Sequence, residues 1–146
     1  MRKNLSNFGF ILLLVLPLAA ASDPIEERDE LMEETRDAIK PMGQMAKGER
    51  DFDADVVAAG LETMQRVASE FGDLFPAGTE TGGGTEAKST IWTDREGFNE
   101  ALDDFASAVE AGMLANPQNV EELRPVLGAI GKSCKSCHDG YRVKDD

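Results

Sequence analysis

Histidine and cysteine are scarce in this chain. Its 146 residues include one histidine and two cysteines. A single histidine excludes a cluster of histidine ligands and any metal held by two imidazoles. Aromatic residues make up only 6% of the sequence, so the core depends on aliphatic side chains, methionine and a few phenylalanines. For a strongly charged domain, this composition predicts that something besides side chains fills part of the interior.

Positive charge is scarce as well. The chain has 15 lysines and arginines against 28 aspartates and glutamates, a formal net charge of −13. Phosphate groups repel such a surface, so the charge argues against nucleic acid or an anionic membrane as the partner. The length predicts one ordinary domain.

The chain has a single long apolar run, from Phe8 to Ala21, which is 14 residues long and follows Arg2 and Lys3. A membrane-spanning helix needs about 20 apolar residues. A basic start, a short apolar run and small residues at its end are typical of a secretory signal peptide. We therefore expect residues 1–21 to be a cleaved signal peptide and residues 22–146 to be the exported domain, with no membrane span after cleavage. An uncleaved membrane anchor is the alternative.

The sequence of residues 22–146 predicts four helices and no strand. The first begins at Asp23-Pro24-Ile25-Glu26, which has an N-cap aspartate and a proline at the first position. Pro41 should kink or interrupt it, because proline cannot donate the helical hydrogen bond. The second helix runs from Asp53 to about Phe75, where Pro76-Ala77-Gly78 ends it.

A glycine-rich loop, Thr79 to Thr90, precedes the third helix, which opens with the capping box Thr93-Asp94-Arg95-Glu96 and ends at Asn116-Pro117. Asn119 can cap the fourth helix. Four helices with short connections predict an all-α fold, an antiparallel four-helix bundle.

Apolar residues recur at helical spacing in all four segments. In the first helix the stripe also takes in polar positions. The expected stripes are Ile25, Arg28 or Asp29, Met32, Arg36 and Ile39; Val56, Val57, Leu61, Met64, Ala68, Phe71 and Leu74; Phe98, Leu102, Phe105, Val109 and Met113; and Val120, Leu123, Val126, Leu127 and Ile130.

The motif that carries chemistry is Cys134-Lys135-Ser136-Cys137-His138, whose pattern is that of a c-type haem attachment site. At roughly 100° per residue, the two cysteines and the histidine fall within about 100° of one helix face. Both sulfurs can then bond the vinyl groups of one haem while the imidazole ligates its iron as the proximal ligand. The pattern predicts one covalently attached haem c, with enough volume to fill the interior.

Three other readings of the cysteines compete with this one. A disulfide between residues three apart on a helix has awkward geometry. A thioredoxin-like redox pair expects a βαβ setting and a helix N-terminus. A zinc site needs further cysteine or histidine ligands that this chain lacks. Because the only histidine belongs to the motif, none remains for the distal base of a peroxidase or for a catalytic triad, and we expect a protein that is not an enzyme.

The position of the motif narrows the class of c-type haem protein. The motif lies eight residues from the C-terminus and follows sequence that is expected to be helical. The chain resembles the cytochrome c-prime (cytochrome c') family, the class II c-type cytochromes, over roughly Pro24 to Lys144. The residues that carry the resemblance are Arg28-x-x-x-Met32, Leu74-Phe75-Pro76, Ile91-Trp92 with Phe98, and Gly131-x-x-Cys134-x-x-Cys137-His138-x-x-Tyr141-Arg142.

This resemblance implies a haem c inside one end of the bundle, beside the first and fourth helices. Cys134 and Cys137 would form the thioethers and His138 the proximal bond. The haem surroundings would include Arg28, Asp29, Trp92, Phe98, Tyr141 and Arg142. The alternatives are that Arg28 is an exposed partner of a nearby acid such as Glu33, and that Arg142 is a solvated charge favoured by the helix dipole.

Met32 lies where the family has its distal residue. If its sulfur ligates the iron, the site is six-coordinate and suited to electron transfer. If Met32 only packs against the ring, a small gas such as NO or CO can bind, whereas an apolar pocket offers no donor to stabilise bound oxygen. Methionine is also a common core residue, so the sequence leaves the two possibilities open.

Two functions follow as expectations. The first is a periplasmic electron carrier of a Gram-negative bacterium, whose acidic surface docks on a redox partner protein. The second is a five-coordinate haem protein that binds NO or CO. The resemblance also implies a homodimer formed through the first two helices.

Overall fold

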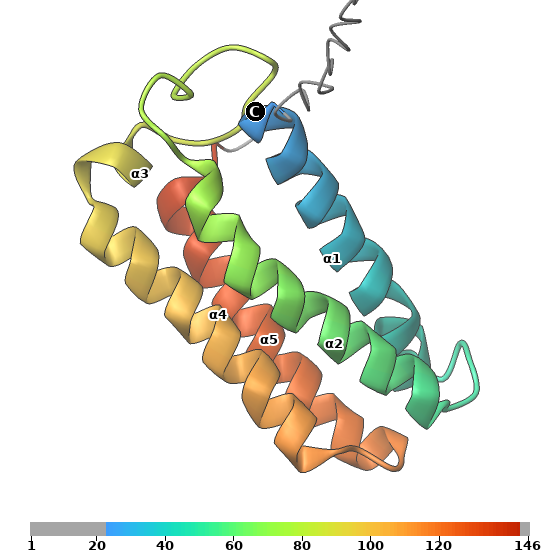
Figure 1. The fold of residues 1–146 in the computed structure, drawn as a ribbon. Helices are drawn as coiled ribbons and strands as arrows, with labels where there is room; N and C mark the ends of the chain where they lie inside the picture. Colours follow the sequence, from blue (N-terminus) through green and yellow to red (C-terminus); the bar gives the residue numbers. More distant parts are fainter. Residues whose placement is uncertain (1–22, 144–146) are drawn as a thin grey trace, which may run out of the picture.

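The computed structural model describes residues 23–143, so the predicted signal peptide lies outside the described residues. Four long helices, α1 (Pro24–Lys47), α2 (Ala54–Glu70), α4 (Arg95–Ala115) and α5 (Val120–Tyr141), pack side by side. Each runs antiparallel to the one before it (Figure 1). Between α2 and α4 lie a 3₁₀ turn, η1 (Phe71–Leu74), and a single-turn helix, α3 (Thr90–Thr93). The predicted all-α four-helix bundle is confirmed.

Side chains cap each long helix at its N-terminus. Asp23 accepts a hydrogen bond from the Ile25 amide at 2.9 Å, and Asn119 accepts one from the Glu122 amide at 3.0 Å. The expectation that Thr93 caps the third long helix is wrong. Asp94 caps α4 instead, accepting from the Gly97 amide at 3.2 Å, because Thr93 is already the last residue of α3.

Two helix ends also differ from the expectation. α2 ends at Glu70, and the chain tightens into η1, which ends at Leu74. Phe75 is not helical, because the proline at position 76 disfavours the α conformation of the residue before it. α1 continues through Pro41 to Lys47 without interruption. Met42 and Met45 are completely buried and hold this last part of α1 on the bundle.

The buried stripe of α1 is rotated from the expected one. Arg36 is exposed and bonds Glu33 at 2.5 Å, so its predicted place in the stripe is wrong. The expected and observed stripes have the same helical spacing, and only packing against α2 and α5 decides between them. The residues that α1 buries are Ile25, Arg28, Leu31, Thr35, Met42 and Met45.

The core is divided into two clusters. The main cluster lies between the four helices and contains Met42, Met45, Val57, Leu61, Met64, Phe105, Val109, Leu123, Val126 and Ile130. The aromatic cluster lies nearer the end where α5 terminates and contains Phe75, Ile91 and Phe98, with Phe71, Trp92, Leu102 and Tyr141 packed against it. None of the helices between residues 23 and 143 is both long and apolar enough to cross a membrane.

The three helices α2, α4 and α5 approach one another closely at Gly112. A Cβ atom built there would lie 2.6 Å from Cγ1 of Val126 and 3.2 Å from Cδ2 of Leu61. Gly112 therefore allows a close approach that no other residue type permits without displacing a neighbour.

Replacing this glycine tests the packing directly. We expect Gly112→Ala to lower the free energy of unfolding by about 1 kcal/mol or more, because the added methyl group forces Val126 to move. Gly128→Ala is the matched control: it is exposed on α5 with no atom within 4 Å of a new Cβ. It should gain about 0.5–1 kcal/mol from helix propensity. Denaturant unfolding followed by circular dichroism measures both, and equal effects would contradict the packing described.

Candidate haem site

The Cys-x-x-Cys-His motif occupies the C-terminal turns of α5, which are helical through Tyr141. Both cysteines are half-buried. Cys134 packs against the main cluster and Cys137 against the aromatic cluster. The two thiols therefore stand where the two parts of the core meet.

The environment keeps both cysteines in the thiol form. Burial raises the pKa of Cys134, and burial together with the neighbouring Cys134 raises the pKa of Cys137 to about 11. A reactive redox cysteine needs a lowered pKa, so these shifts disfavour a thioredoxin-like pair. Within residues 23–143, no group of three or more histidine, cysteine and acidic side chains could hold a bare metal ion.

His138 is exposed next to these thiols. Even so, partial desolvation lowers its pKa, and the charge of Arg142 acts in the same direction. A lower pKa favours the neutral imidazole, which is the form that ligates a metal. The main-chain carbonyl of His138 accepts a hydrogen bond from the Arg142 amide at 3.1 Å, which closes the last turn of α5.

Arg28 is buried, with 4% of its surface exposed. Its Nε donates to the Leu74 carbonyl at 2.7 Å, and Nη1 donates to the Thr79 carbonyl at 3.1 Å and to Oγ1 of Thr85 at 3.4 Å. Nη2 donates to Oγ1 of Thr79. The alternative of an exposed partner for Glu33 is therefore wrong.

The guanidinium of Arg28 also stacks on aromatic rings. Its carbon lies 4.1 Å from the centroid of Phe75 and 5.5 Å from that of Trp92. Burial lowers the pKa of Arg28 and nearby carboxylates oppose this shift, but an arginine stays charged at neutral pH. Arg28 donates most of its N–H groups to the end of η1 and to the segment after it, and so joins α1 to both.

The aromatic residues expected around the haem lie together at this end of the bundle. Phe98 is 1% exposed and contacts Phe75 and Tyr141 edge-on, at centroid distances of 4.9 and 5.3 Å. Trp92 is half-buried and donates to the Pro76 carbonyl at 3.2 Å, and the Tyr141 hydroxyl donates to Asp94 at 3.0 Å. Together they form the apolar wall next to Cys137.

The remaining predicted residues are placed differently. Arg142 is exposed and bonds Glu86 at 2.5 Å. Asp29 lies on the exposed face of α1, away from the buried stripe. Met32 is half-buried on α1, one helical turn after Arg28.

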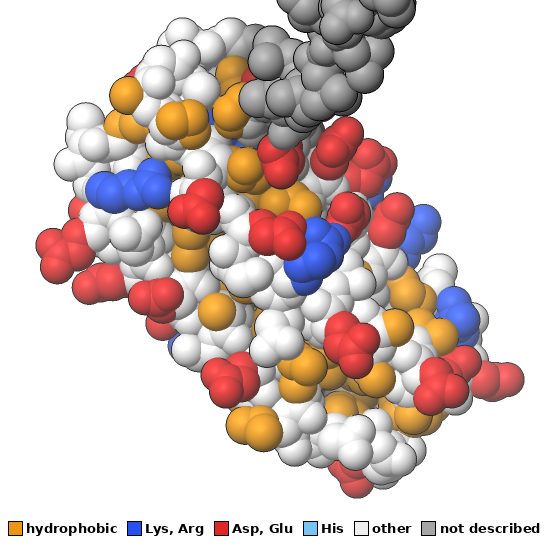
Figure 2. Space-filling view, viewed as in Figure 1, with side chains coloured by type: hydrophobic (Ala, Val, Ile, Leu, Met, Phe, Trp, Pro, Cys, Tyr) orange, Lys and Arg blue, Asp and Glu red, His pale blue; other side chains and the backbone are white. Residues whose placement is uncertain are grey.

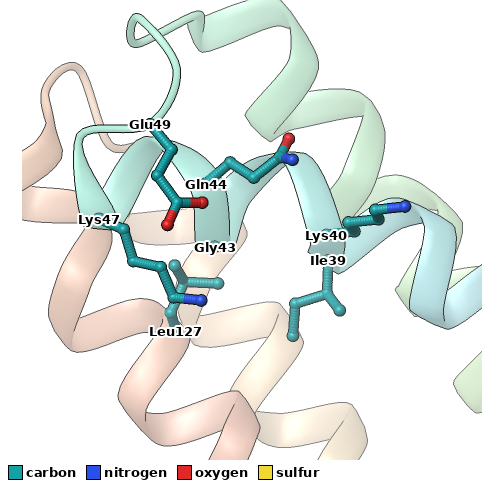
Figure 3. Close-up of a pocket in the computed structure, with 7 residues that line it drawn as sticks. All are labelled: Ile39, Lys40, Gly43, Gln44, Lys47, Glu49 and Leu127. Atoms are coloured by element: carbon teal, nitrogen blue, oxygen red, sulfur yellow. The ribbon is translucent and has the colours of Figure 1, made fainter.

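Two surface hollows lie away from these residues. One of about 480 Å³ lies between the last turns of α1 and the middle of α5, and Figure 3 shows side chains from both helices around it. No predicted site residue lines it. Its lining residues are Ile39, Lys40, Gly43, Gln44, Lys47, Glu49 and Leu127.

The residues at the end of α5 fit a haem c. Two protonated thiols are one turn apart on one helix face, an accessible imidazole follows them, and apolar clusters flank both cysteines. Cys134 and Cys137 would hold the haem and His138 would ligate its iron. These are the donors that covalent haem attachment requires.

Sequence reasoning missed several residues of this region. Leu31 and Thr35 are buried on α1, and Ser133 is buried beside Cys134. Glu86 was missed as the partner of Arg142, and Thr79 and Thr85 as partners of Arg28. Because these partners are 51 to 57 residues apart along the chain, no local pattern signals them.

Comparisons with known proteins agree with this site. The profile of the family described as Cytochrome C' matches residues 23–142. A cytochrome c' of Rhodopseudomonas palustris is 34% identical over 125 residues, covering 86% of this chain and 85% of that protein.

Solved structures give the same result. A cytochrome c' from Rhodopseudomonas palustris superposes with a TM-score of 0.82 at 32% identity, covering 86% of this chain and 100% of that one. A nitric oxide complex of a mutant cytochrome c prime from Alcaligenes xylosoxidans has a TM-score of 0.72 at 27% identity, covering 83% and 94%. The chain belongs to the cytochrome c' family and carries a covalently attached haem c.

Proposed function

We propose that this protein is an exported one-electron carrier whose haem iron is ligated by His138 and Met32. The observation that supports it concerns how the chain uses methionine. Met42, Met45 and Met64 are completely buried in the main cluster, and Met113 packs against it. Among residues 23–143, Met32 is the one methionine that belongs to neither cluster.

This difference bears on whether Met32 is a core residue or a ligand. Core filling explains the other four methionines, because a flexible thioether fits irregular gaps. It does not explain Met32, which is half-buried on the α1 turn after Arg28. A thioether at this place is available to a group bound between α1 and α5.

The haem supplies a one-electron redox couple when bound, and a histidine–methionine ligand pair raises its potential. The chain contributes the rest. Cys134 and Cys137 would fix the ring to α5, and His138 would ligate the iron from the same helix. The aromatic cluster excludes water beside Cys137. The N-terminal sequence pattern supports export to the periplasm.

Gas binding is the second candidate function. The nitric oxide complex of the Alcaligenes xylosoxidans protein supports it, because that relative has the same fold. In this chain it requires that Met32 leave the sixth position of the iron open. The two candidates therefore differ at one side chain.

The ligation by Met32 can be tested with carbon monoxide. We expect the reduced protein to give a sharp low-spin absorption spectrum that CO leaves unchanged. Met32→Ala should become high-spin and bind CO, because alanine removes the sixth ligand. Met64→Leu is the control, a swap of similar volume inside the main cluster, and should behave as the unmodified protein. A broad spectrum that CO sharpens before any substitution would establish the gas-binding alternative instead.

The acidic surface supports docking on a basic redox partner. Exposed carboxylates gather along the first half of α1, on the helix that carries Met32 (Figure 2). They are Glu26, Asp29, Glu30, Glu33, Glu34 and Asp37. Arg36 and Arg66 neutralise only some of them.

Electron exchange with a small basic cytochrome, used as a probe, tests this docking face. The rate should fall several-fold as ionic strength rises, because salt screens the attraction. The double variant Asp29→Asn/Glu30→Gln should slow exchange at low salt. Asp103→Asn/Glu110→Gln removes the same charge from exposed positions on α4 and should slow it less. Exchange independent of salt would count against electrostatic docking.

A homodimer through α1 and α2 is also proposed. A shallow hollow of about 470 Å³ lies between these helices and is lined partly by small or apolar side chains such as Ala38, Pro41 and Ala59. Glu34, Asp37 and Arg66 line it too, so a dimer formed here leaves Glu26, Asp29, Glu30 and Glu33 as the carboxylates of the docking face. We expect sedimentation equilibrium to give the mass of a dimer. Ala59→Lys should shift the protein towards monomer, whereas Ala129→Lys on exposed α5 should not. A monomer mass at every concentration would contradict the dimer.

A further inference from the structure

The segment from Leu74 to Lys88 connects α1 directly to the end of α5. We call residues 74–88 the strap. On the α1 side, Leu74, Thr79 and Thr85 accept the four hydrogen bonds that Arg28 donates. The strap also packs on α1 at Gly83, which has a φ of 57°, and a Cβ built there would lie 3.0 Å from Cγ2 of Ile25.

On the α5 side, the strap pairs with the residues that follow His138. The Lys88 amide donates to the Tyr141 carbonyl at 2.9 Å, and the Val143 amide donates to the Glu86 carbonyl at 2.7 Å. Ala87 and Arg142 form an isolated antiparallel bridge. Nζ of Lys88 adds a bond to the Asp139 carbonyl at 2.9 Å.

These two sets of anchors are adjacent in the chain. Thr85 bonds α1 and Glu86 bonds the end of α5, so no residue lies between the two sets of anchors. Met32 lies four residues after Arg28, and His138 lies four residues before Arg142. The strap therefore links the turn before Met32 to the turn after His138.

We propose that the strap sets the spacing between Met32 and His138 across the haem, and that Arg28 is the positioning residue that fastens α1 to it. The inference deepens the proposed function and rests on Met32 as the distal ligand. An arginine suits this role because its planar group donates in several directions and stacks on Phe75 and Trp92 at once. Lysine offers a single ammonium group without the planar fork.

The first experiment compares CO binding by reduced, haem-loaded variants. Arg28→Gln should admit CO although Met32 is intact, with association faster by at least about tenfold, since several charged hydrogen bonds to the strap are lost. Arg28→Lys should bind CO more slowly than Arg28→Gln does. Arg36→Gln, which removes an exposed arginine from the same helix, should leave CO binding unchanged.

A second variant keeps every anchoring side chain. Two glycines inserted between Thr85 and Glu86 separate the α1 anchors from the α5 anchors and should also admit CO. The same insertion between Arg50 and Asp51, in the connection between α1 and α2, is the matched control and should leave binding unchanged. If Arg28→Gln fails to fold, the insertion between Thr85 and Glu86 alone tests whether the strap excludes CO.

The outcomes separate the two proposals. If the strap variants melt at lower temperature but exclude CO as the unmodified protein does, the strap is merely structural and the inference is overturned. If the unmodified protein itself binds CO, ligation by Met32 is wrong. The strap is then judged by CO association rates, where faster association in both strap variants supports it and equal rates overturn it. Hydrogen exchange of the Leu31–Thr35 amides, faster in the strap variants, gives a readout independent of CO.

Discussion

Two thiols and an imidazole can serve one flat group from a single helix only if they lie three and four residues apart on one face. The last turns of α5 meet this constraint, and the end of the bundle is arranged around them. The helix stays regular through Tyr141, and the strap pairs with Tyr141 and Val143 at its end. The core divides into two clusters, with Cys134 against one and Cys137 against the other.

Much of the architecture follows from local signals in the sequence. The caps Asp23 and Asn119 mark helix starts because their side chains satisfy amides two or three residues away. The haem motif is equally local, since five consecutive residues define it. Identification of Cys134, Cys137 and His138 required no tertiary information.

Other features depend on partners far along the chain. The periodicity of α1 permits stripes through Met32 and Arg36 or through Leu31 and Thr35, and only packing selects the second. The sequence leaves Arg28 either in the stripe or exposed beside Glu33, because its acceptors Leu74, Thr79 and Thr85 lie 46 to 57 residues away. Thr93 and Asp94 are both good caps, and the extra turn α3 decides between them.

Methionine occurs in two settings between residues 23 and 143, and the proposed function rests on the difference between them. Four of the methionines between residues 23 and 143 fill the main cluster, while Met32 stands apart from both clusters at the end that carries the haem motif. X-ray absorption at the iron edge of the reduced protein tests this account most directly. Ligation by Met32 predicts one sulfur scatterer in the first coordination shell of the iron, and this scatterer should be absent in Met32→Ala. A first shell of nitrogen alone would contradict it.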